Sequence, residues 1–167
     1  MKLYVTYCSR NKREGAYTPD KLYISDRIVC FVERCKSKSA NWAIFSALYG
    51  FFFPEEKKGK YDVTFKSDKK YWLGIAIIKD KKKLSYAKSK RHILQLTEKM
   101  KQQIDNRKIE QIIFYAPFPK RAKCYLGILH YAFDECQKTH GWRELIKHVE
   151  AQSKIISVMK SIKSDFN

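Results

Sequence analysis

Residues 41–46, NWAIFS, form the stretch that best indicates the fold class. A short apolar run bounded by turn residues is typical of a central strand buried on both faces of a parallel sheet. Two further strands are predicted at residues 2–7, where apolar and polar side chains alternate, and at residues 109–115, which are rich in isoleucine and aromatic residues.

Helices are predicted between and after these strands, because apolar residues recur there at helical spacing. The predicted helices are residues 20–36 with Asp20 as N-cap, residues 86–106, residues 124–137, and an amphipathic last helix from residue 142 to about residue 163. Residues 55–68 are predicted to be a loop, residues 70–78 fit a helix or a strand, and residues 79–83 form a solvated run of charge.

Strands that alternate with helices predict an α/β fold. We expect a three-layer sandwich, in which helices cover both faces of a central, mostly parallel sheet. Residues 1–140 would form the core domain, and residues 141–167 a C-terminal helix packed on the same domain.

The balance of charge is the strongest indication of function. The 167 residues include 35 lysine and arginine residues against 17 aspartate and glutamate residues, for a formal net charge of +18. A folded chain with this excess repels itself, and nucleic acid is the commonest reason for it, because phosphate contacts release condensed counterions. A lysine-rich host proteome is the alternative explanation, and an anionic membrane surface is a third.

Several other classes of protein are disfavoured by the sequence. No apolar run is long enough to span a bilayer, and the first residues are charged too early for a signal peptide. No P-loop, dinucleotide-binding glycine motif, paired-carboxylate motif or zinc-site spacing is present, so neither a metal nor a cofactor is expected. The cysteines are odd in number and have no paired spacing, which predicts free thiols in the cytoplasm. They are Cys8, Cys30, Cys35, Cys124 and Cys136.

Sites in α/β folds form in the loops beyond the carboxyl ends of the strands. The loop after Tyr7 contains Cys8, Ser9 and Lys12, and its thiol, hydroxyl and cations suit an anion or a base. Cys8 could be a nucleophile or simply a small buried residue, since no histidine lies nearby in sequence to act as its base.

The loop after Ser46 turns at Gly50 and continues into three phenylalanines at residues 51–53. These rings could stack on a base, but burial in the core is the favoured interpretation. Asp62, which follows Tyr61 in a predicted loop, could act as a general acid or base or could cap a turn.

Two groups of basic residues could hold phosphates. The first lies at the head of a predicted helix after the strand that ends at Tyr115, where backbone N–H groups also favour anions. The second lies around Tyr86, and its alternative interpretation is an ordinary solvated surface. The first group is Lys120, Arg121 and Lys123, and the second is Lys81, Lys82, Lys83, Lys88, Lys90 and Arg91.

The order of several short motifs resembles an uncharacterised microbial and phage domain family. The motifs are Cys8-Ser9-x-x-Lys12, Leu22-Tyr23-x-Ser25, Trp42-x-Ile44-x-Ser46-Ala47-x-Tyr49-Gly50, Pro54, and Tyr61-Asp62-x-Thr64. That family is similar to the YaaA-type peroxide-stress proteins and, more distantly, to the core domain of archaeosine synthase. The resemblance, which covers about residues 3–130, implies a uracil-DNA-glycosylase-like architecture and a shared pocket.

Charge, strand-end loops and resemblance together predict a nucleic-acid-binding protein that modifies or processes a nucleobase of tRNA or DNA. Whether it is a transferase, a glycosylase-like enzyme or no enzyme is left open. In this hypothesis Asp62 is the general acid or base, and Cys8 or Lys12 is the nucleophile or anion holder. The substrate-binding residues would be Ser9, Tyr23, Ser25, Ser46, Tyr49 and Tyr61. The alternatives are a non-catalytic nucleic-acid binder and a protein partner that docks on a larger modification enzyme.

Overall fold

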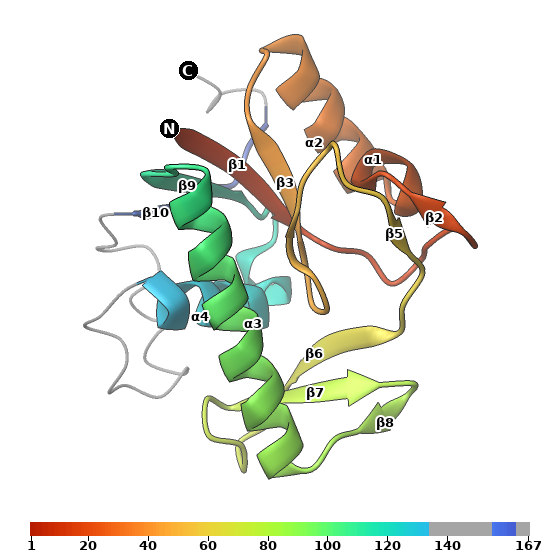
Figure 1. Cartoon of the computed structure of the whole chain (residues 1–167), viewed down its shortest axis with the longest axis vertical. Coiled ribbons are helices and arrows are strands. Elements are labelled where there is room, and N and C mark those ends of the chain that lie inside the picture. The colour runs from red at the N-terminus through yellow and green to blue at the C-terminus, as the bar shows by residue number, and fades with distance from the viewer. Residues whose placement is uncertain (134–154, 163–167) are drawn as a thin grey trace.

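A five-stranded mixed sheet organises the chain, whose computed structural model describes residues 1–133 and 155–162 (Figure 1). Its order is β10-β9-β1-β3-β4, and only the β3–β4 pairing is antiparallel. The strands are β1 (Lys2–Tyr7), β3 (Trp42–Ser46), β4 (Gly50–Phe52), β9 (Gln111–Tyr115) and β10 (Ile156–Met159). The prediction of an α/β fold around a mostly parallel sheet is confirmed.

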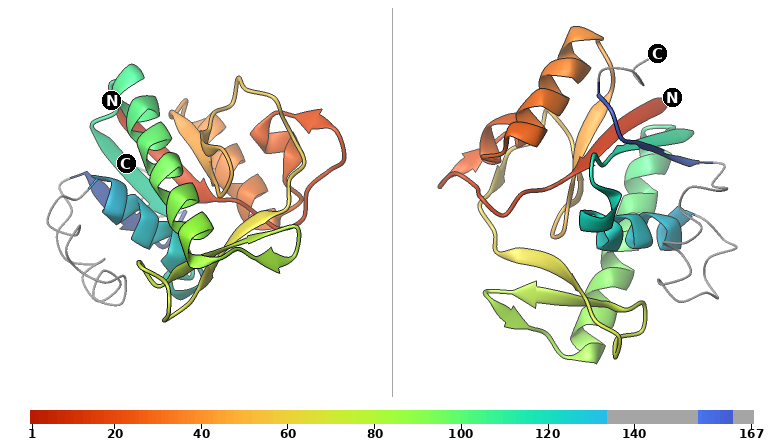
Figure 2. Two further views of the ribbon diagram at one scale, coloured as in Figure 1. Left: turned by 60° about the horizontal axis from the view of Figure 1, so that its bottom comes forward. Right: turned by 180° about the vertical axis from the view of Figure 1, so that it is seen from behind.

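Helices cover both faces of this sheet (Figure 2). On one face lies α2 (Asp26–Ser37), whose Phe31 ring stacks on Tyr115 of β9 with ring centroids 5.9 Å apart. The other face is covered by α3 (Tyr86–Asn106) and α4 (Lys123–Phe133), and Tyr125 of α4 packs edge-on against Phe45 of β3 at 5.2 Å. The three-layer arrangement thus rests on aromatic contacts on opposite faces of the same sheet.

A second, smaller sheet lies below the first in Figure 1 and is antiparallel in the order β6-β7-β8. It comprises β6 (Val63–Ser67), β7 (Ile75–Lys79) and β8 (Lys82–Lys83). The prediction of a loop over residues 55–68 is therefore wrong for β6, whose buried Val63 and Phe65 alternate with exposed residues. The open choice over residues 70–78 is resolved as a strand for residues 75–78, while residues 70–74 form turns. A two-stranded ribbon joins β2 (Ala16–Tyr17) to β5 (Lys58–Gly59).

The last predicted helix is also wrong where the structure describes it. Residues 156–159 form β10, which pairs in parallel with β9 at the edge of the main sheet. The reason is that a short apolar run fits either period, and Ile156 and Met159 are buried against β9 rather than on a helix face. The rest of that prediction, residues 142–154 and 163, lies outside the described residues, as do residues 134–137 of the preceding predicted helix.

The first predicted helix is interrupted. It begins as α1 (Pro19–Leu22), stops at Tyr23, and resumes as α2 after the N-cap residue Ser25. Asp20 therefore lies inside α1 and does not cap it; its carboxylate accepts hydrogen bonds from the hydroxyl of Thr18 and the ammonium of Lys36. The extended backbone at the break turns the Tyr23 side chain into the protein interior.

The phenylalanines at residues 51–53 are buried, which confirms their interpretation as core. Gln103 of α3 closes the outer edge of β4, since its amide donates to the carbonyl of Phe51 at 2.7 Å and accepts from the Phe51 N–H at 2.9 Å. Gly50 approaches Gln103 so closely, at φ +74°, that a Cβ there would lie 2.8 Å from the amide oxygen. The turn after β3 therefore requires glycine.

Candidate functional site

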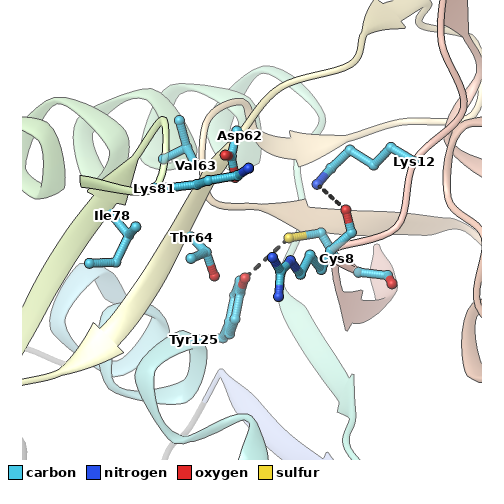
Figure 3. Close-up of a pocket in the computed structure, with 10 residues that line it drawn as sticks. Cys8, Lys12, Asp62, Val63, Thr64, Ile78, Lys81 and Tyr125 are labelled. Atoms are coloured by element: carbon cyan, nitrogen blue, oxygen red, sulfur yellow. Dashed lines mark hydrogen bonds between the residues drawn. The ribbon is translucent and has the colours of Figure 1, made fainter. Parts of the chain in front are cut away.

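A cavity of about 310 Å³ opens where the loop after β1 meets the small sheet (Figure 3). This is the carboxyl end of β1, the side of the sheet on which the sequence predicts a site. Its lining comes from the β1 loop, β6, the β7–β8 hairpin and α4. The lining residues are Cys8, Ser9, Arg10, Lys12, Asp62, Val63, Thr64, Ile78, Lys81 and Tyr125.

The charged groups around this pocket are mainly cationic. Arg10, Lys12 and Lys81 face a single lining carboxylate, that of Asp62. Lys81 and its neighbour Asp80 occupy left-handed backbone conformations, with φ of 63° and 49°, and so form the tight turn between β7 and β8. The pocket thus combines a positive rim with an apolar wall from Val63 and Ile78, a pattern that suits an anionic ligand with a flat apolar part.

Cys8 lies in the floor of the pocket. Its N–H donates to the carbonyl of Phe45 at 2.9 Å, which extends the pairing of β1 with β3 by one residue. The Sγ atom lies 3.1 Å from the hydroxyl of Tyr125, and either group can be the donor. Burial, followed by the proximity of Cys8, raises the pKa of Tyr125 well above its usual value, so Tyr125 presents a neutral hydroxyl to the sulfur.

Behind the floor, buried hydroxyl groups form a hydrogen-bonded chain. The Ser46 Oγ accepts from the N–H groups of Leu48 and Tyr49, at 3.2 and 3.0 Å, and donates to the Tyr61 hydroxyl at 2.8 Å. The Tyr61 hydroxyl in turn lies 2.8 Å from that of Tyr23. Burial is the main reason that the pKa values of both tyrosines are raised well above normal. We call Ser46, Tyr61 and Tyr23 the hydroxyl chain.

Lys12 links the hydroxyl chain to the pocket. Its Nζ lies over the ring of Tyr61, 4.1 Å from the centroid, and 5.7 Å from that of Tyr23. An isolated antiparallel bridge between Lys12 and Tyr23 fixes its backbone. Partial burial lowers the pKa of Lys12, while Cys8 and Asp62 partly oppose this effect. The rings and the two potential anions thus hold a cation at the pocket wall.

Arg27 is a site-supporting residue that sequence reasoning missed. From the first turn of α2, its guanidinium stacks 3.6 Å from the centroid of the Tyr7 ring. It donates hydrogen bonds to the hydroxyl of Thr6 and, at 2.7 Å, to the carbonyl of Tyr7. Burial lowers the pKa of Arg27, opposed by Tyr7 and then Cys8. Arg27 therefore fixes the end of β1, and so the position of Cys8, from the opposite face of the sheet.

The structure divides the predicted pocket residues between the cavity, the hydroxyl chain behind it, and positions outside both. Cys8, Ser9, Lys12 and Asp62 line the cavity, and the hydroxyl chain of Tyr23, Ser46 and Tyr61 lies behind it. Tyr49 packs edge-on against Tyr61 at 5.1 Å and donates to the carbonyl of Gly59. Ser25 is not among the lining residues, because it stands at the N-cap of α2.

The predicted phosphate-binding residues lie on several different elements. Lys81 lines the pocket, while Lys82 and Lys83 alternate to opposite faces of the small sheet. Lys88 and Arg91 are exposed on α3, and the Nζ of Lys90 lies 5.1 Å from the centroid of the Trp72 ring. In η1 (Pro119–Arg121), Lys120 and Arg121 are exposed, whereas Lys123 at the start of α4 is half-buried.

Tyr125 is the second functional residue that sequence reasoning missed. It lies within a helix that looks like core in the sequence, and the register of that helix against the sheet is what directs its hydroxyl to Cys8. Cys8 and Tyr125 are more than a hundred residues apart in the sequence, so no local pattern indicates that they meet.

Within residues 1–133 and 155–162, no helix is long and apolar enough to cross a membrane. In the same residues, no group of three or more histidine, cysteine, aspartate or glutamate side chains is placed to hold a metal ion.

Comparison of the chain with protein-family models, with curated proteins and with solved structures finds no match. The motif resemblance described above therefore remains a hypothesis, which rests on the matching residues alone.

Proposed function

We propose that this protein binds nucleic acid and receives one nucleobase or nucleotide in the pocket between the β1 loop and the small sheet. The observation that carries the proposal is the lining itself, in which Arg10, Lys12 and Lys81 face only Asp62 at the carboxyl end of a parallel strand. A volume of about 310 Å³ is at the small end of ligand sites and suits a single base or nucleotide rather than a larger group.

The charge of the whole chain supports the same proposal. An excess of +18 raises the local concentration of polyanions and accelerates their encounter with the protein. The cations at the rim would then hold phosphate oxygens, while Val63 and Ile78 would contact the face of the base. A base inside a helix cannot reach such a pocket, so the bound base must be unpaired or extruded.

Base processing is the leading form of the proposal because nucleophilic and acid–base groups line the same cavity. Cys8 presents a sulfur beside the Tyr125 hydroxyl, and Asp62 presents a carboxylate across the pocket. These groups could act on a base held between them. We further propose, from the motif resemblance, a uracil-DNA-glycosylase-like fold, and a cytoplasmic location in which the Cys8 thiol stays reduced.

A non-catalytic binder is the second candidate, and the exposure of Asp62 favours it, since a general acid is usually shielded from water. The two candidates can be distinguished by incubating tRNA and DNA with the protein and analysing the nucleosides afterwards. Processing predicts a changed nucleoside or a released base with the wild type, and none with Cys8→Ser or Asp62→Asn. Unchanged nucleosides in all three incubations would contradict base processing and support the non-catalytic binder.

Binding itself is tested by titrating labelled tRNA, single-stranded DNA and duplex DNA at about 50 and 200 mM salt. Lys81→Glu should weaken binding and reduce the dependence of log K on log salt by about 1 or more. Lys38→Glu is the matched control. Lys38 is exposed and stands at the C-cap of α2, whereas the first turn of the same helix contacts the carboxyl end of β1. Lys38 therefore lies at the end of α2 that points away from the pocket. Equal losses from both variants, or no binding by the wild type, would refute the proposal.

A further inference from the structure

The outer face of the small sheet leads directly away from the pocket. Thr64 pairs with Ile78, and Ile78 with Lys83, so these three side chains form one row across the three strands. Thr64 and Ile78 also line the cavity, which makes the row continuous with the pocket. The next row on this face contains Lys66, which is exposed and pairs with Ala76.

Two aromatic rings lie at the far end of this face. The Nζ of Lys83 is 2.9 Å from the carboxylate of Asp68 and 5.4 Å from the centroid of the Tyr71 ring. Tyr71 packs against Tyr86, with ring centroids 5.9 Å apart, and donates a hydrogen bond to the carbonyl of Leu84. Tyr86 is 45% exposed, so its ring packs on Tyr71 and still presents a surface to solvent.

The chemistry of this face fits an unpaired strand of nucleic acid. Exposed aromatic rings stack on any base whose face is free, and lysines beside them contact the phosphates. In a duplex the base faces are already stacked on one another, so Tyr86 would have no equivalent partner. The five-residue strands β6 and β7 are each about 17 Å long, so this face extends over about that length between the pocket and the rings.

We propose that this face binds single-stranded nucleic acid and leads one of its bases into the pocket. We call the face, made of Thr64, Lys66, Ile78 and Lys83 with Tyr71 and Tyr86 at its end, the platform. The inference rests on the proposed function, which it deepens by naming the form of the nucleic acid. It assigns a role to Tyr71, Tyr86 and Lys66 as binding residues outside the cavity.

The test is fluorescence anisotropy with a labelled single-stranded oligonucleotide, as DNA and as RNA, and with the duplex of the same sequence. Tyr86→Ala should weaken single-strand binding about 5-fold or more and leave duplex binding unchanged. Leu94→Ala is the matched control, because Leu94 is 40% exposed on the same helix, and its affinity should stay close to that of the wild type. Comparison of the DNA and RNA strands shows which of the two is preferred.

A second variant tests the platform without removing a ring. Lys66→Ala should reduce the salt dependence of single-strand binding by about 0.7, the value for one phosphate contact on a single strand. Unchanged single-strand binding by Tyr86→Ala, or tighter binding of the duplex by the wild type, would overturn the platform. If Lys81→Glu still weakens binding in that case, the pocket proposal stands alone; if the wild type binds no nucleic acid, both proposals fail.

Discussion

Tyr61→Phe is the most informative single change to the site, because it removes one oxygen atom from the middle of the hydroxyl chain. The Tyr61 side chain is buried, and its hydroxyl lies 2.8 Å from both the Ser46 Oγ and the Tyr23 hydroxyl. The variant deprives both of these buried groups of a partner. Loss of a partner in a buried site costs about 1–3 kcal/mol, so we expect a loss of about 2 kcal/mol in the free energy of unfolding.

For a chain of this size, each kcal/mol corresponds to about 2–4 °C, so the midpoint of thermal unfolding should fall by about 4–8 °C. The assay is thermal unfolding followed by circular dichroism, with urea unfolding as an independent measure of the free energy. Tyr49→Phe is the control, since the half-buried Tyr49 makes one longer bond, 3.3 Å to the carbonyl of Gly59, and should lose less than about 1 kcal/mol. An unchanged midpoint for Tyr61→Phe, or an equal fall for both variants, would refute the reasoning.

Three further predictions concern the turn, the thiols and the pocket cation. Gly50→Ala should lower the free energy of unfolding, measured in urea, by about 2 kcal/mol or more, because φ is +74° and a Cβ would clash with the Gln103 side chain. Gly59→Ala is the control: its Cβ would meet nothing within 4 Å, so the free energy of unfolding should change by less than about 0.5 kcal/mol. Iodoacetamide at about pH 8 should alkylate the exposed Cys30 well before Cys35, whose pKa burial raises to about 12; peptide mass spectrometry showing the reverse order would contradict this. Because burial lowers the pKa of Lys12, its positive charge is lost at a lower pH than that of an ordinary lysine. Lys12→Met should therefore weaken single-strand binding strongly at about pH 7 and less at about pH 10. An equal loss of affinity at both pH values would contradict a role for the charge of Lys12.

The parts of the fold that the sequence predicts well are long or strongly patterned. The helix Tyr86–Asn106 has apolar residues at helical spacing from Ile93 to Ile104, and its bounds are those predicted. The strand Lys2–Tyr7 is likewise recovered in full. The errors fall on two short strands, β6 among charged residues and β10 in the four-residue segment Ile156–Met159. In both, pairing with a neighbouring strand decides the structure.

The candidate site divides in the same way. Cys8 and Ser46 could be predicted because Cys8 directly follows β1 and Ser46 is the last residue of the parallel neighbour β3, and such strand ends meet at one edge of the sheet. Tyr125 and Arg27 could not, because they reach β1 from helices on opposite faces, and the packing of a helix on a sheet leaves no local sequence signal. The sequence suggests a single basic group around Tyr86, but strand alternation directs the side chains of Lys82 and Lys83 to opposite faces of the small sheet.

Photocross-linking tests most directly whether the pocket between the β1 loop and the small sheet is where a base enters. A single-stranded oligonucleotide carrying a photoreactive pyrimidine would be irradiated with the wild-type protein, and the adducts would be mapped by peptide mass spectrometry. We predict adducts on Cys8 or Tyr125 in the floor of the pocket, and their loss in Lys81→Glu but not in Lys38→Glu. Adducts confined to α2, or equally abundant in Lys81→Glu, would contradict the account.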